Sequence, residues 1–341
     1  MEDGSSMEKS DVKIIKDLNK KLIRKAFFEL HIQTAAELSQ ATGLSVVTTN
    51  ALLREMMEDK EVLISAELVS NGGRPAAKYQ YNEFYQCTAV VYGYQKNNKD
   101  FITMIVTDIF GKCILRECKT MENITDRSFE SMLDKAFVEF PMIRIVAFGL
   151  PGEEADGNIL YNDYKGIVGK SFIKHYENRY QVPILFVNDV NAAVNGYYYK
   201  KAYPDKNVVG IFFPRLYDPG AGIIINGEIY TGLQGFAGEI GFFPNGIKWD
   251  ELDYQNEDAV LDAISNVIAI LSCVVAPDRF VLYGDFFQKG SKDKLEQRIN
   301  FMLRNQYTAW IDISTELAGD IEYGLICQAS RELQNVEGLL E

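Results

Sequence analysis

The first sixty residues combine helical apolar spacing with signals for helix ends. Apolar residues recur every three or four positions, which predicts one helix with a shared apolar face. The residues of that face are Ile14, Ile15, Leu18, Leu22, Ile23, Ala26, Phe27 and Leu30. Asp11 is the expected N-cap of this helix. Thr34 and Glu37 have the spacing of a capping box, which predicts a second, short helix reaching Ala41.

A tight turn and a third helix follow. Gly43 can take the positive φ that such a turn needs, and Ser45 caps a helix to about Lys60. The residues available for its inner face are Val46, Leu52, Leu53 and Met56. Two short strand-like segments, 62–64 and 78–81, flank a glycine-bearing turn at 71–75 and predict a β-hairpin. Three helices and a hairpin in this order are typical of a winged helix-turn-helix, and a generic helical cap with a hairpin is the alternative.

From about residue 83 the chain alternates strand-like and helix-like patterns, which is typical of α/β architecture. Apolar strand-like runs lie at 101–106, 143–148, 184–187, 208–213, 223–225 and 280–283. Helical patterns lie at roughly 128–140, 166–180, 190–202 and 257–275. Asn226-Gly227 between apolar segments predicts a type I′ hairpin.

Charge divides the chain at nearly the same place. The net charge is −13, yet residues 8–78 hold 11 Lys and Arg against 10 Asp and Glu, and residues 79–341 hold 24 against 36. An acidic body repels phosphate, so any contact with DNA is expected in the N-terminal segment alone.

Length and composition exclude several classes of protein. A chain of 341 residues with 47% hydrophobic residues predicts two or three globular domains. Its longest apolar runs are far shorter than the ~20 residues of a membrane helix, and the polar N-terminus lacks the core of a signal peptide. Residues 1–10 are expected to be a disordered lead, or one that is not native to the protein. Five scattered cysteines and two histidines favour a reducing cytoplasm and no metal site. His175 is expected at the surface, without a catalytic role.

Four stretches together resemble the ROK family, which includes sugar kinases and sugar-responsive repressors. They are the helix-turn-helix ending in Gly73-Arg74-Pro75, residues 148–152 with 156–159, residues 188–193, and residues 220–227 continuing through 235–241. The resemblance implies an actin-like ATPase (ribonuclease H-like) fold of two α/β lobes after the winged helix-turn-helix. The expected domains are 11–82 for DNA binding and 83–341 for the body. Within the body, a first lobe is expected at about 83–188 with C-terminal helices at about 311–341, and a second lobe at about 189–310.

The departures from the family pattern bear on catalysis. Where family kinases have a glycine-rich phosphate loop, the chain reads Tyr92-Gly93-Tyr94, and the second loop reads Pro214 to Gly220 with Asp218 inside it. Bulky, proline-bearing and acidic loops are poor phosphate ligands. Phe242 stands where the family has a zinc-binding His. We therefore expect no cofactor, no metal and no enzymatic activity.

The resemblance also implies a ligand site at Asn188, Asp189 and Glu239. Asp189 matches the family's general base, and its carboxylate can accept a hydrogen bond from a sugar hydroxyl even without ATP. The alternative is structural: Asp189 caps a helix, Asn188 ends a strand, and Glu239 lies in a solvated turn.

These observations predict a transcriptional regulator of the ROK type, a repressor. Its expected partners are double-stranded operator DNA, a small neutral or cationic sugar-like effector, and further copies in a homodimer or dimer of dimers. The candidate DNA contacts are Ser45, Thr48, Thr49, Asn50, Arg54 and, at the wing tip, Arg74. The alternatives are a sugar kinase carrying a DNA-binding domain, and a DNA-binding dimer whose body no longer binds a ligand.

Overall fold

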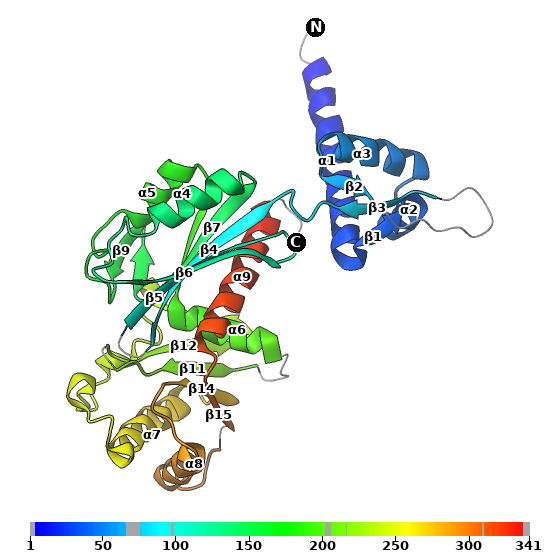
Figure 1. The fold of residues 1–341 in the computed structure, drawn as a ribbon. Helices are drawn as coiled ribbons and strands as arrows, with labels where there is room; N and C mark the ends of the chain where they lie inside the picture. The colour runs from blue at the N-terminus through cyan, green and yellow to red at the C-terminus, as the bar shows by residue number, and fades with distance from the viewer. Residues whose placement is uncertain are drawn as a thin grey trace. The chain divides into compact units, whose positions relative to one another are not determined.

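The computed structural model describes residues 4–65, 76–96, 99–201, 206–215, 217–308 and 310–336 (Figure 1). The chain divides into two compact units, which are described separately below. The N-terminal unit comprises residues 1–87, 108–112 and 330–341, and the main unit comprises residues 88–107 and 113–329.

The N-terminal unit contains three helices and a small antiparallel sheet (Figure 1). The helices are α1 (Gly4–Leu30), α2 (Ala35–Thr42) and α3 (Val46–Glu58). The sheet has the order β1-β3-β2, from β1 (Ile32–Thr34), β3 (Lys78–Tyr81) and β2 (Val62–Ile64). The predicted helices and the antiparallel pair β2–β3 are confirmed, whereas β1 was not predicted.

Local hydrogen bonds set the ends of α2 and α3 as the sequence predicts. The backbone N–H of Thr34 donates to Glu37 Oε2 over 2.7 Å, and that of Glu37 donates to Thr34 Oγ1 over 3.2 Å, which completes the capping box. Gly43 has φ +72°, and Ser45 Oγ accepts from the N–H of Thr48 over 3.1 Å. The turn between α2 and α3 is therefore determined by residues within four positions of one another.

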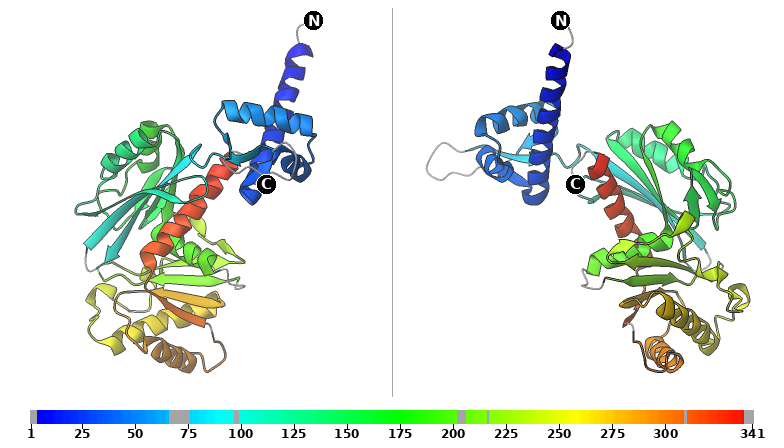
Figure 2. Two further views of the ribbon diagram at one scale, coloured as in Figure 1. Left: turned by 45° about the vertical axis from the view of Figure 1, so that its right-hand side comes forward. Right: turned by 180° about the vertical axis from the view of Figure 1, so that it is seen from behind.

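The helix α1 differs from its prediction in two ways. It begins at Gly4, so neither a disordered lead over residues 4–10 nor an N-cap at Asp11 is correct; after Gly4 the segment has no Gly or Pro to end a helix. The predicted apolar face is also divided. Ile23, Ala26 and Phe27 are buried, but Ile14, Ile15, Leu18, Leu22 and Leu30 are 43–58% exposed. The N-terminal half of α1 extends past α2 and α3, which pack against its other half (Figures 1 and 2).

The main unit is built on two five-stranded sheets, each containing parallel and antiparallel pairs. The first has the order β10-β7-β4-β5-β6, from β10 (Ile184–Asn188), β7 (Ile143–Leu150), β4 (Cys87–Lys96), β5 (Lys99–Thr107) and β6 (Cys113–Met121). The second has the order β13-β12-β11-β14-β15, from β13 (Glu228–Ile229), β12 (Gly220–Ile225), β11 (Val208–Phe212), β14 (Arg279–Tyr283) and β15 (Trp310–Ser314). The predicted α/β class is confirmed.

Helices cover and connect these sheets. They are α4 (Glu130–Glu139), α5 (Phe172–Tyr180), α6 (Asp189–Lys201), α7 (Glu257–Val274), α8 (Ser291–Met302) and α9 (Leu317–Val336). Phe129, Phe148 and Phe172 lie fully buried between α4, α5 and the first sheet. A second core lies between the second sheet and helices α7 and α8, where Ile264, Phe280 and Leu295 are fully buried.

The helices α6 and α9 cross with their backbones in contact. A Cβ atom on Gly196 would lie 1.9 Å from the carbonyl oxygen of Asp320, and one on Gly324 would lie 2.0 Å from that of Ala192. No other residue fits either position without separating the helices. The crossing places α6 against strands of both sheets.

Several predicted boundaries need correction. The predicted type I′ hairpin is confirmed, since Asn226 and Gly227 have φ of +54° and +85° between paired strands. The helix predicted from residue 166 begins only at Phe172, because residues 166–171 form turns that include Gly169 at φ +71°. Residues 311–314, predicted to begin the C-terminal helices of the first lobe, instead belong to β15, a parallel partner of β14 in the second sheet.

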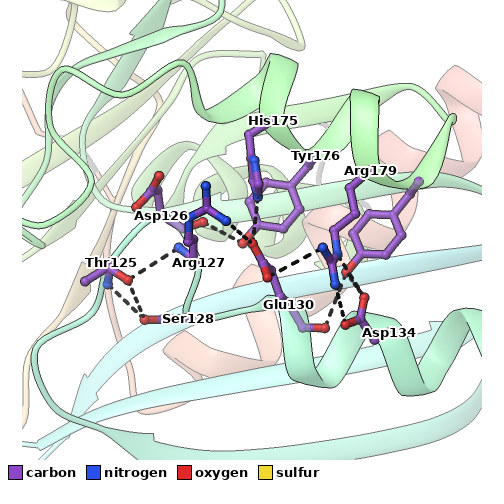
Figure 3. Close-up of polar contacts among 10 residues, drawn as sticks. Thr125, Asp126, Arg127, Ser128, Glu130, Asp134, His175, Tyr176 and Arg179 are labelled. Carbon is purple, nitrogen blue, oxygen red and sulfur yellow. Dashed lines mark hydrogen bonds and ion pairs between the residues drawn. The ribbon is translucent and has the colours of Figure 1, made fainter.

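A polar network on the exterior joins α4 to α5 (Figure 3). Glu130 accepts from His175 Nε2 over 2.8 Å and lies 3.5 Å from Arg127 and 3.7 Å from Arg179. Arg179 also pairs with Asp134 over 2.6 Å. The His175 side chain is 23% exposed, so it is half-buried in this network and not fully at the surface as expected.

No helix within the described residues is both long and apolar enough to cross a membrane.

Candidate functional site

The outer surface of α3 carries most of the predicted DNA contacts. Ser45 and Arg54 are exposed, and Thr48 and Asn50 are half-buried at the same surface. The Asn50 amide already donates to the carbonyl oxygen of Val46 over 2.9 Å, so a base contact must replace or share that hydrogen bond. Arg74 lies outside the described residues.

Thr49 was wrongly predicted as a contact residue. Its side chain is completely buried, and its hydroxyl donates to the Ser45 carbonyl oxygen over 3.0 Å. The reason is helical geometry, because Thr49 lies three, four and seven positions before Leu52, Leu53 and Met56, which form the buried face.

Two apolar residues of the α3 surface were missed or misplaced. Val47 is 81% exposed, and Val46, which was expected to face inward, is 50% exposed. Val47, Ala51 and Arg54 lie at i, i+4 and i+7 and therefore on one face of the helix. The sequence signal that could have predicted this exposure is the helical position of Val47, which lies outside the face formed by the buried residues.

The main unit contains a polar cavity of about 260 Å³ where several loops meet. It is lined by the residues directly after β7, the end of the strand β9 (Asn158–Tyr161), the junction of β10 and α6, Pro214 with residues 217–220, and the segment after β13. The sequence-predicted residues Asn188, Asp189 and Glu239 all line it. Residues up to 51 positions apart in sequence are thus brought to one place.

Asn188 ends β10, as the structural alternative expected, and it also takes the helix-capping role that this alternative gave to Asp189. Its Oδ1 accepts from the N–H groups of Val190 over 2.9 Å and Asn191 over 3.1 Å, which caps α6. Its Nδ2 donates to the Gly152 carbonyl oxygen over 3.3 Å. Asn188 therefore shapes the cavity wall while both ends of its amide are engaged.

Asp189 has one carboxylate oxygen engaged and one available. Its Oδ1 accepts from the N–H of Val190 over 2.9 Å, and its Oδ2 accepts no hydrogen bond from any described residue. The residue is 7% exposed, and burial, with a further contribution from Asp163, raises its pKa to about 7. A ligand hydroxyl that donates to Oδ2 would satisfy this carboxylate.

Further carboxyl groups, not singled out by the sequence, gather around Asp189. Burial and the neighbouring Glu239 and Asp189 raise the pKa of Glu153 to about 8. Burial raises the pKa of Asp163 to about 6 against the opposing charge of Lys165, and burial also raises that of Glu239. Desolvation and mutual repulsion therefore raise the free energy of the state in which all these carboxyl groups are ionised. Glu153 is the first residue of β8 (Glu153–Ala155), and Asp163 follows the paired strand β9; neither position has a local sequence signal.

The residues that the resemblance places at the first phosphate loop are used for packing. The Tyr92 hydroxyl donates to Glu322 Oε2 over 2.7 Å, and Arg116 pairs with the same carboxylate. Tyr94 stacks on Phe101 with ring centroids 5.3 Å apart. A Cβ atom on Gly93 would lie 2.5 Å from the Tyr164 hydroxyl, so the space above this glycine is filled.

A second cavity of about 430 Å³ adjoins these residues. It is lined by Tyr94, residues 212–215, Gly284, Asp285 and residues 314–319. Arg215, a cation in its lining, is paired with Asp285 over 2.6 Å and lies over the rings of Tyr254 and Phe286. Its charge is therefore already matched.

Across the described ranges, no group of three or more His, Cys, Asp or Glu side chains is arranged to hold a metal ion. Phe242, which the resemblance places at the family's zinc-binding His, is exposed.

Comparison with known proteins agrees with the resemblance seen in the sequence. Residues 99–251 match the ROK family. The xylose repressor of Bacillus subtilis (strain 168) is 27% identical over 252 residues, which cover 69% of this chain and 62% of the repressor. The chain thus matches less than two thirds of the length of this relative.

Two solved structures show the fold. One is a ROK family transcriptional regulator described as a homologue of the E. coli MLC protein, with a TM-score of 0.63, 15% identity, and coverage of 95% of this chain and 99% of that chain. The other is a ROK hexokinase from Thermus thermophilus, with a TM-score of 0.58, 15% identity, and coverage of 73% and 100%. The actin-like ATPase-type fold with mixed sheets, expected from the resemblance, is confirmed.

The raised pKa of Glu153 predicts a pH-dependent stability. The ordinary pKa of the group is 4.5, so stability gained from the neutral form is complete below about pH 4.5 and is lost as the pH rises to about 8. The melting temperature of the wild type should fall by a few degrees between pH 5 and pH 8, since about 1 kcal/mol shifts it by roughly 2–4 °C. In Glu153→Gln the melting temperature, measured by calorimetry, should decrease less over this pH range. The exposed Glu139→Gln is the control and should show the same decrease as the wild type. An equal decrease in wild type and Glu153→Gln would contradict the prediction.

Proposed function

We propose, from the premise that residues 99–251 belong to the ROK family, that this protein is a DNA-binding transcriptional repressor whose main unit senses a neutral or cationic sugar-like effector. The observation that carries the proposal is the combination of a capped α2–turn–α3 unit with a ROK-type cavity lined by carboxylates. The repressor identity of the Bacillus relative supports it.

In this proposal the N-terminal unit is a winged helix-turn-helix, spanning about residues 11–82. The α3 helix enters the major groove, and the β2–β3 pair belongs to the wing. Ser45 and Thr48 lie at the helix N-terminus, where hydroxyls and N–H groups meet phosphates. Arg54 supplies a cation, and Val47 and Ala51 supply apolar contacts of the kind made to thymine methyl groups. Arg74 remains the predicted minor-groove contact of the wing.

The effector occupies the cavity at Asp189 and Glu239. Carboxylate oxygens accept hydrogen bonds from hydroxyls, and a bound polyol would replace water without adding negative charge. An anionic sugar would meet Asp163, Asp189 and Glu239 together, with Lys165 as the opposing cation of the lining. A neutral or cationic ligand is thus favoured by electrostatics.

The protein acts in this proposal as a homodimer or dimer of dimers in a reducing cytoplasm. Paired DNA-binding units match paired half-sites, and the effector alters their spacing by binding one arrangement more tightly than the other. The exposed apolar residues of α1, centred on Leu18, are the type of surface that homodimers bury.

Two alternatives remain. A sugar kinase with a DNA-binding domain is favoured by the solved kinase structures of this fold, and a DNA-binding dimer without an effector is favoured by the replacement of the His position by Phe242. The packing of Tyr92, Tyr94 and Tyr164 at the first phosphate loop opposes the kinase, because phosphoryl transfer depends on positioned phosphate ligands.

The DNA-binding role predicts that Arg54→Ala weakens operator binding. Loss of a good base contact costs about 1–3 kcal/mol, and loss of a phosphate contact lowers the salt slope by about one. Binding to a site selected from random duplexes, measured by fluorescence anisotropy at several salt concentrations, tests this. Arg144→Ala, an exposed cation in the main unit, is the control. Unchanged affinity and salt slope in Arg54→Ala would refute the docking of α3.

The effector role predicts that Asp189→Asn weakens sugar binding. Hydrogen bonds to charged groups contribute about 1.5–3 kcal/mol, so affinity should fall by at least about tenfold. Calorimetry with free sugars and their phosphates measures this, and the phosphates should bind more weakly than the free sugars. Glu139→Gln is the exposed control. Tight binding of a sugar phosphate would contradict the electrostatic argument, and absence of binding by any sugar would favour the effector-free alternative.

Absence of kinase activity is the third expectation. Sugar-dependent ADP release in the presence of Mg²⁺ and ATP should not exceed background, measured by a coupled assay with a ROK hexokinase as positive control. Release above background that is abolished by Asp189→Asn would establish the kinase alternative instead.

A further inference from the structure

Two exposed phenylalanines stand at the edge of the carboxylate cavity. Phe242 lines the cavity, yet it is 69% exposed. Phe236 is 58% exposed, and the two ring centroids lie 5.8 Å apart with an angle of 33° between the rings. Exposure of two neighbouring rings is unfavourable by itself, and such apolar surface beside a polar cavity commonly marks a binding site.

The segment that carries these rings is anchored on its other side. Ile240 is 1% exposed within the core of the second sheet, and Ala237 and Phe243 pack against the same core. Gly238 has φ +99°, and a Cβ atom on it would lie 1.8 Å from the carbonyl oxygen of Ala221. The segment therefore lies directly on β12. Because the inward residues are held, the two phenylalanines are presented outward by a fixed backbone.

Size supports a ligand that extends beyond the cavity. The cavity measures about 260 Å³, below the range of about 300–1,000 Å³ of ordinary small-molecule pockets. Glu239 and Phe242 belong to one short turn, η2 (Ile240–Phe242) and its preceding residue. A hydroxyl-bearing ring held by Glu239 and Asp189 would thus have its next unit beside the phenylalanine pair.

Resting on the proposed effector site, the geometry points to a disaccharide or longer oligosaccharide as the ligand, with one ring in the carboxylate cavity and the next ring lying with its C–H face on Phe236 and Phe242. The hydroxyls of the first ring donate to the carboxylates, and the second ring covers apolar surface that is otherwise exposed. Phe236 and Phe242 would then set ligand length, while Asp189 and Glu239 set ligand polarity.

Calorimetry with matched sugars tests this assignment on the full chain. The probes are xylose with xylobiose, glucose with cellobiose and maltose, and N-acetylglucosamine with its β-1,4-linked dimer. At least one disaccharide should bind about tenfold or more tightly than its monosaccharide. Phe236→Ala should remove most of that advantage and leave monosaccharide affinity unchanged, because Phe236 does not line the cavity. Phe242→Ala should also remove most of the advantage. Leu233→Ala, an 85% exposed residue of the same segment that does not line the cavity, is the matched control.

The outcomes separate this inference from the function on which it rests. If monosaccharides bind and Asp189→Asn weakens them, but disaccharides gain nothing or Phe242→Ala leaves their affinity unchanged, the second-ring site is refuted and the effector site stands. If Phe242→Ala changes the oligomeric state in light scattering while disaccharide affinity is unchanged, the rings serve self-association and the inference also fails. If no sugar binds, both fail together.

Discussion

The crossing of α6 and α9 is the constraint on which the main unit depends. Gly196 and Gly324 let the two backbones touch, so that α6 can lie against strands of both sheets. Side chains of α9 contact both sheets as well: Glu322 holds Tyr92 and Arg116 of the first, and Asp320 accepts from Tyr283 of the second. The N-terminus of α6 carries Asp189, so the same crossing that joins the sheets also positions the carboxylate at the centre of the candidate site. A larger residue at either glycine would move both.

The carboxyl groups around Asp189 are in electrostatic conflict, because they repel one another when they are charged. Carboxyl groups from separate elements are partly desolvated close together, which raises the pKa values of Glu153, Asp163 and Asp189. Protonation relieves this conflict, and hydroxyl donors can satisfy the carboxylate oxygens that remain charged. Because the contributing residues come from β8, the segment after β9, the start of α6 and the segment after β13, a ligand that contacts several of them would stabilise one arrangement of those elements. That differential stabilisation is the physical requirement of an effector.

The N-terminal unit depends on a different kind of interaction. Local caps at Thr34 and Ser45 fix the helix ends, and a buried ion pair between Arg24 and Glu61, with the Tyr81 hydroxyl donating to the same carboxylate over 3.1 Å, links α1 to the sheet. Within this unit, residues 8–78 hold 11 Lys and Arg against 10 Asp and Glu, whereas residues 79–341 hold 24 against 36. A contact with phosphate is therefore electrostatically possible at this unit and opposed elsewhere. Recognition of DNA and recognition of a small ligand are thereby assigned to parts of the chain with different charge.

The sequence by itself determined the features that depend on neighbouring residues. The capping box of Thr34 and Glu37, the turn at Gly43 and the Asn226-Gly227 hairpin are each decided within four positions, and all are present in the structure. The resemblance to the ROK family also implied one site for Asn188, Asp189 and Glu239, and all three line the cavity. Only the tertiary structure decided which residues of a helix pack against another element and which remain at the surface. Thr49 is buried, while Leu18 and Val47 are exposed. It also decided that Asp163 lines the cavity and that Glu153 lies close enough to Asp189 and Glu239 to feel their charge, because these encounters depend on how distant strands pack. The raised pKa values follow from burial that no local pattern records.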